Sequence, residues 1–113
     1  MTDLIYKICT TAQWREAVRT GRFDGAPIDI TDGFIHFSTA EQVAETAAKH
    51  FAGQDGLLLV AVDATKLGDG LRYEVSRGGR LFPHLYAALP LAAVVSAEPM
   101  PLGPDGRHDI RLP

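Results

Sequence analysis

The segment Thr31-Asp-Gly-Phe-Ile-His-Phe-Ser-Thr39 predicts a short strand that follows a turn and leads into a helix. Side chains alternate across a strand, so Ile35 and Phe37 point to one face while Phe34, His36 and Ser38 point to the other. The first face is typical of a protein core. The second carries a histidine and a hydroxyl beside an aromatic ring, which indicates a place where an α+β domain holds a small polar ligand.

The residues after this strand predict the start of a helix. Ser38 and Thr39 are followed three positions later by Glu41 and Gln42, which is the spacing of a capping box. The predicted helix continues to about Ala52. Free amides at its start carry a partial positive field, so we expect an anion such as phosphate to bind there.

The elements outside this segment are predicted from periodicity and turn residues. Two helices near the start, followed mainly by strands, predict a compact α+β domain with a bent or split mixed sheet. We expect one domain over 1–113, with its core at about 4–97 and a surface or loose tail at 99–113. The expected elements are a strand at 4–8, a helix at 12–20, an irregular exposed segment at 28–31, a central strand at 57–62, and strands at 71–76 and 91–97.

Composition limits the classes of function. The chain has 113 residues, of which 46% are hydrophobic and 22% charged, as in ordinary globular proteins. Its net charge of −3 disfavours broad binding to nucleic acid. No apolar run approaches the roughly 20 residues that cross a bilayer, and the N-terminus does not resemble a signal peptide. We therefore expect a cytoplasmic protein without membrane partners, in which the single cysteine, Cys9, is a small buried residue.

A second polar cluster follows the strand predicted at 71–76. In Ser76-Arg-Gly-Gly-Arg80, the glycines allow close backbone approach and the arginines suit phosphate or carboxylate, although an exposed hairpin with solvated arginines explains the pattern equally well. In Phe82-Pro-His-Leu-Tyr86, His84 is either held by neighbouring rings or a ligand contact. The functional hypothesis depends on whether His36 and His84 converge.

Other chemistry-bearing residues leave alternatives open. Glu74 lies in the middle of a strand, where it is either a surface residue or a catalytic carboxylate. No Cys/His spacing fits a zinc site, yet His36, His84 and one carboxylate would suffice for a facial triad of metal ligands. No glycine-rich dinucleotide or phosphate loop is present.

Several of these motifs resemble those of a known family. They are Ile5-Tyr-Lys-Ile8, Trp14, Gly21-x-Phe23, Asp32-Gly-Phe-Ile-His-Phe-Ser-Thr39, Gln42, Thr46-Ala47, His50-Phe51, Glu74, Ser76-Arg-Gly-Gly and Phe82-Pro-His-Leu-Tyr86. Together they resemble the DUF952 family of small bacterial proteins of unknown function, over about residues 4–97. That family has been grouped by similarity with the ADP-ribosyltransferase-like fold, which includes NAD-dependent RNA 2′-phosphotransferases. The resemblance implies a split, strongly bent sheet with a cleft for NAD.

The resemblance also implies roles for individual residues. In that superfamily an early-strand histidine contacts a ribose of NAD, which His36 matches, and a later glutamate orients the ribose, which Glu74 would match. Tyr73 or Tyr86 would stack on nicotinamide. The phosphotransferases carry a set of four residues, Arg-His-Arg-Arg. Part of this set would correspond to Arg77, Arg80 and His84.

Three hypotheses follow. The first is binding of NAD or an ADP-ribose-type nucleotide, with NAD as a substrate for glycosyl or phosphoryl transfer and no metal. In this hypothesis His36 and Glu74 are catalytic, and the ligand-binding residues are Ser38, Thr39, Arg77, His84 and Tyr86. The second is a non-catalytic binding module for a phosphorylated or carboxylated metabolite. The third is a divalent-metal hydrolase that uses His36 and His84. The oligomeric state stays open.

Overall fold

The computed structural model describes residues 3–112, except for the side chain of Arg77. The described part has three α-helices and eight strands, joined in places by short 3-10 turns. In chain order they are β1 (Leu4–Thr10), α1 (Thr11–Thr20), β2 (Arg22–Phe23), α2 (Pro27–Asp32), β3 (Ile35–His36), α3 (Val43–His50), β4 (Leu57–Asp63), β5 (Leu71–Val75), β6 (Leu81–Leu85), β7 (Leu89–Pro90) and β8 (Val94–Pro99).

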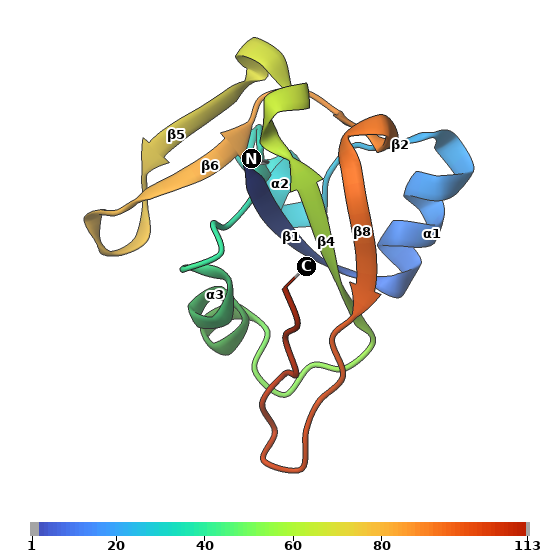
Figure 1. Ribbon diagram of the computed structural model, residues 1–113, viewed down its shortest axis with the longest axis vertical. Coiled ribbons are helices and arrows are strands. Elements are labelled where there is room, and N and C mark those ends of the chain that lie inside the picture. Colours follow the sequence, from blue (N-terminus) through green and yellow to red (C-terminus); the bar gives the residue numbers. More distant parts are fainter. Residues whose placement is uncertain (1–2, 113) are drawn as a thin grey trace.

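The strands form three separate sheets. One has the order β1-β4-β8, another has the order β3-β6-β5, and β2 pairs with β7. Figure 1 shows the first sheet in the middle of the molecule, with α1 and α3 on opposite sides of it, while β5 and β6 extend outward as an arm. The α+β class and the split sheet are thus confirmed. Instead of the expected mixed sheet, every pairing among the described residues is antiparallel.

The core lies on both faces of β4, as its unbroken apolar sequence predicts. Val60 and Val62 pack into one hydrophobic cluster, while Leu59 and Ala61 pack into another. The second cluster includes Met100, which is 1% exposed. Residues just beyond β8 therefore cover one face of the central sheet. No helix in the described part is long and apolar enough to span a membrane.

The prediction that 28–31 is irregular and exposed is wrong, because this segment belongs to α2. Pro27 occupies the first helical turn, and Gly33 ends the helix with a φ of 86°, a left-handed conformation that glycine adopts readily. Ile28 and Ile30 are exposed as expected, but Asp29 between them is only 2% exposed. The short helix therefore points a carboxylate into the protein.

Candidate functional site

Strand pairing brings the two predicted histidines together. In the antiparallel register of β3 and β6, His36 lies directly opposite His84, and the ring centroids are 5.6 Å apart. Arg72 on β5 lies opposite His84 on its other side. Paired residues in adjacent strands share a face of the sheet, so the two polar clusters seen in the sequence form one surface.

Phe34 connects the aromatic residues of this surface. Its ring centroid lies 4.6 Å from that of His36, 4.1 Å from that of His84 and 5.1 Å from that of Tyr86. The separations from His36 and Tyr86 fall within the roughly 4.5–7 Å that aromatic pairs favour, and the separation from His84 is slightly shorter. The four rings form a continuous aromatic cluster that limits the rotation of both imidazoles.

His36 is held between two carboxylates. Its Nδ1 lies 2.6 Å from Asp29 Oδ1, and its Nε2 lies 2.9 Å from Asp32 Oδ2. Only the imidazolium form carries a hydrogen on both ring nitrogens, so only that form donates to both carboxylates at once. Asp29 is buried, whereas the side chains of Asp32 and His36 are 39% and 32% exposed.

Asp29 is the centre of this arrangement. Its carboxylate accepts hydrogen bonds from Lys7 Nζ at 2.9 Å, from the amide of Ala26 at 2.7 Å and from the amide of His36 at 3.1 Å, in addition to the ring of His36. Burial by itself would raise the pKa of Asp29. The hydrogen bond from His36 and the charge of Lys7 outweigh burial and bring the pKa down to about 2.

Lys7 lies on β1 and is 6% exposed. Burial lowers the pKa of its ammonium group, and the charge of Asp29 opposes that change. Sequence reasoning missed both partners of this ion pair. Two signals were present: a lysine inside the apolar strand Leu4–Thr10, and an aspartate flanked by isoleucines in a segment with proline at its start and glycine at its end.

Glu74 holds the second histidine. One of its oxygens, Oε1, lies 2.9 Å from His84 Nδ1 and accepts a hydrogen bond of 2.7 Å from the hydroxyl of Tyr86. The hydrogen bond from Tyr86, followed by that from His84, lowers the pKa of Glu74 below its ordinary value. The same contact raises the pKa of Tyr86. Glu74 is therefore a fixed carboxylate anion at neutral pH.

A cleft of about 640 Å³ opens beside these residues. Both histidines and Ser38 line it, whereas Thr39, Glu74 and Tyr86 do not. Its lining combines polar groups with apolar walls and comes from β1, α2, β3, α3, β6 and the end of β5: Tyr6, Lys7, Ile8, Ile28, Asp32, His36, Phe37, Ser38, Thr46, His50, Phe51, Ser76, Phe82 and His84.

The expected anion site at the amides of Ser38 and Thr39 is not formed. The amide of Ser38 donates to the carbonyl of Tyr6 at 2.8 Å, and the amide of Thr39 donates to Gln42 Oε1 at 3.0 Å. Both donors are thus already used. The physical reason is that Ser38 pairs with β1, so the α-helix begins only at Val43.

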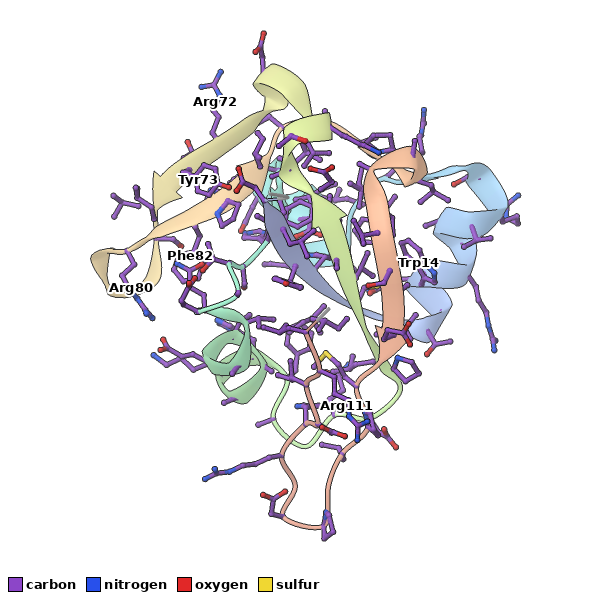
Figure 2. The ribbon with its side chains drawn as sticks, in the orientation of Figure 1. Trp14, Arg72, Tyr73, Arg80, Phe82 and Arg111 are labelled. Atoms are coloured by element: carbon purple, nitrogen blue, oxygen red, sulfur yellow. The ribbon has the colours of Figure 1, made fainter. Side chains whose placement is uncertain are left out.

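The Arg-Gly-Gly-Arg sequence forms the turn between β5 and β6. Gly78 and Gly79 have φ values of 69° and 73°, which explains the need for glycine there. Arg80 reaches from this turn to α3, where its guanidinium lies 2.8 Å from Glu45 Oε1. Figure 2 shows Arg80 near the end of the arm. The predicted contact of Arg77 with a ligand concerns a side chain outside the described part.

Comparison with known proteins gives a family and one solved relative. The family model for proteins of unknown function named DUF952 matches residues 8–97. The crystal structure of protein CC0527 from Caulobacter crescentus is 49% identical, with a TM-score of 0.90, and the match covers 94% of this chain and 93% of that chain. The solution NMR structure of CC0527 gives a TM-score of 0.83 at 50% identity, covering 92% and 90%. No curated protein matches.

We expect replacement of Asp29 by asparagine to destabilise the fold strongly. Lys7 would remain buried without a counter-charge, and such a change costs about 3–5 kcal/mol of the free energy of unfolding. Urea denaturation measures this loss. In a matched control, Glu45→Gln removes the partner of the exposed Arg80 and should cost less than about 1 kcal/mol. Equal losses in both variants would contradict the structural role of the buried pair.

The low pKa of Asp29 also predicts a dependence of stability on pH. An unfolded aspartate has a pKa of about 3.9, whereas folded Asp29 has a pKa of about 2, so the unfolded chain binds the proton more tightly. The stabilisation is complete above about pH 5 and is lost as the pH falls toward 2, by about 2–3 kcal/mol. The difference in unfolding free energy between the wild type and Asp29→Asn should shrink over this interval. A constant difference would contradict the assignment.

Proposed function

Since this chain belongs to the DUF952 family, whose function is unknown, we propose a function from the chemistry of its cleft: it binds a nucleotide of NAD or ADP-ribose type. The observation that carries this proposal is the orientation of His36. Asp29 holds the buried Nδ1, which turns Nε2 toward Asp32, a partly exposed side chain that also lines the cleft. A ribose is well suited to this pair, because its hydroxyls can take the place of the direct contact, one accepting from Nε2–H and another donating to Asp32.

The shape and lining of the cleft support a nucleotide ligand. A volume of about 640 Å³ falls within the range of small-molecule and cofactor sites, which is roughly 300–1,000 Å³. Ile28, Phe51 and Phe82 supply apolar walls for a base or a nicotinamide ring. Among the polar side chains of the lining, Asp32 and His84 lie beside His36, as expected of a site that orients its ligand through a few placed polar groups.

Glycosyl transfer is the reaction that suits these groups best. The N-glycosidic bond would break with its electron pair leaving on nicotinamide, and an acceptor would form the new bond to the ribose carbon and release its proton to solvent. Positive charge develops on the ribose in this transition state, and a fixed carboxylate stabilises such charge. Glu74 is such a carboxylate, although it reaches the cleft through His84 rather than lining it.

A binding module without turnover is the second candidate. It is favoured by the two hydrogen bonds that Glu74 already accepts, because a carboxylate with two fixed donors is less available to a reacting centre. The metal-hydrolase hypothesis has the least support. Within the described residues no group of three His, Cys, Asp or Glu side chains is arranged to hold a metal ion, and His36 has a carboxylate at each ring nitrogen.

We expect NAD or ADP-ribose to stabilise the wild-type protein and to lose this effect in His36→Ala. A ligand at about 100 times its dissociation constant adds roughly 2.7 kcal/mol to the free energy of unfolding. Thermal-shift measurements with NAD, ADP-ribose, RNA ends and simple anions provide the test. His108→Ala is the matched control, since His108 contacts the carbonyl of Gln54 outside the cleft.

Two outcomes would contradict nucleotide binding at His36. One is a wild type that neither NAD nor ADP-ribose stabilises; a shift with simple anions alone would favour the metabolite-binding module. The other is His36→Ala that stays folded by circular dichroism and retains the full shift. A shift with added divalent metal, reversed by a chelator, would revive the hydrolase hypothesis.

A measurement of nicotinamide release from NAD distinguishes an enzyme from a binding module without turnover. If Glu74 stabilises the transition state, Glu74→Gln should lower the rate of release by about 10²–10³-fold while changing NAD affinity little, because the effect is specific to the developing charge. Chromatographic detection of nicotinamide measures the rate. A wild type that binds NAD without releasing nicotinamide would show the binding module instead.

A further inference from the structure

β5 is an edge strand of the sheet that carries the site. Within residues 3–112, the order β3-β6-β5 leaves one side of β5 without a neighbouring strand, and Figure 1 shows β5 along the outer side of the arm. An unpaired edge presents backbone donors and acceptors that readily pair with another chain. In β5 these outward groups belong to alternate residues, because the residues between them bond to β6.

The hydrogen bonds to β6 identify them. The amide of Ser76 donates to the carbonyl of Arg80 at 2.9 Å, and the amide of Tyr86 donates to the carbonyl of Gly70 at 2.8 Å, so positions 70 and 76 face β6. Bonded positions alternate in an antiparallel pair, so Tyr73 points its amide and carbonyl outward. Its partner on β6 is a proline, Pro83, which has no amide to share.

The neighbours of Tyr73 follow the same alternation. Val75 presents both its amide and its carbonyl outward, and Leu71 presents its carbonyl, because the amide of Leu71 donates to Gly68. Among residues 3–112, the turn and loop hydrogen bonds use neither the amide nor the carbonyl of Tyr73 or Val75. The edge is thus open along the part of β5 that is centred on Tyr73.

The sequence of this edge is complementary to itself. In Leu71-Arg-Tyr-Glu-Val75, Tyr73 has a charged residue and then an apolar residue on each side. The two charged residues, Arg72 and Glu74, have opposite signs. When a second copy pairs with it antiparallel and Tyr73 faces Tyr73, Arg72 of each copy lies opposite Glu74 of the other. Opposite charges across a strand pair stabilise it, and here no like charges face each other.

The apolar side chains of the arm point the same way. Tyr73, Val75 and Leu81 are 48%, 69% and 52% exposed, although all three are large and hydrophobic. Val75 is paired with Leu81, so the two lie on one face, opposite to the face of His84. Figure 2 shows Arg72 projecting away from the body of the molecule. A two-fold axis at Tyr73 would join the two apolar faces into one.

We propose that the protein forms a symmetric dimer through antiparallel pairing of β5 with β5 of a second copy. The interface is isologous, since the same strand serves both partners. It brings the guanidinium of Arg72 from the second copy beside Glu74, so the carboxylate that holds His84 gains a positive neighbour from the partner. This proposal stands whatever molecule the cleft binds.

Analytical ultracentrifugation from micromolar to millimolar concentration tests the dimer. The wild type should change from 12.2 kDa to twice that mass as the concentration rises. Tyr73→Pro should remain monomeric, because proline removes an amide that bonds the second copy and none that bonds β6. Arg15→Glu is the control: Arg15 is exposed on α1, so this charge reversal should leave dimerisation unchanged.

A charge-exchange experiment identifies the register. Arg72→Glu and Glu74→Arg each place like charges opposite one another. Each variant alone should therefore dimerise at least about tenfold more weakly than the wild type. A mixture of the two restores both opposite-charge contacts and should form the heterodimer. A wild type that stays monomeric at millimolar concentration would overturn the proposal. A dimer that Tyr73→Pro leaves intact would overturn it too, as would a mixture of folded charge variants without heterodimer.

Discussion

The rest of this structure depends on the ion pair and hydrogen bonds of the buried Asp29 carboxylate. It joins α2 to β1 through Lys7 and orients the ring of His36 on β3, so one group serves three elements. Burying a charge is costly unless it is paired and hydrogen-bonded, and here the surrounding donors meet that requirement. The same contacts that hold α2 in place therefore also define the direction of the imidazole at the cleft.

The second histidine is held in an analogous way with the burial reversed, because the side chain of His84 is 6% exposed and that of Glu74 is 37% exposed. Glu74 fixes His84 as Asp29 fixes His36, and Phe34 lies against both rings. The strand register then sets their separation. A site of this kind is preorganised, because its polar groups are oriented by the protein before any ligand arrives.

Local patterns in the sequence predicted much of the fold. The helix predicted at 12–20 is α1, which Thr10 and Gly21 cap, and the unbroken apolar run predicted as a strand at 57–62 is the central strand β4. Both were predictable because caps and burial patterns act over a few residues. The ion pair between Lys7 and Asp29 was missed, since its partners are 22 residues apart and only tertiary packing brings them together. His36 and His84 were both candidates from the sequence, but their proximity follows from the register of β3 and β6, which the sequence did not predict.

The separation of the sheets has a consequence for cooperativity. The sheet that carries the histidines shares no strand with the central sheet; a bridge between Tyr6 and Ser38 connects the two near β3. Regions with fewer buried contacts open at lower free energy than the core, so the exposed tip of the β5–β6 arm, at Val75 and Leu81, can fluctuate while β1, β4 and β8 stay intact. The tip of the arm can thus vary in sequence with little loss of stability in the central sheet.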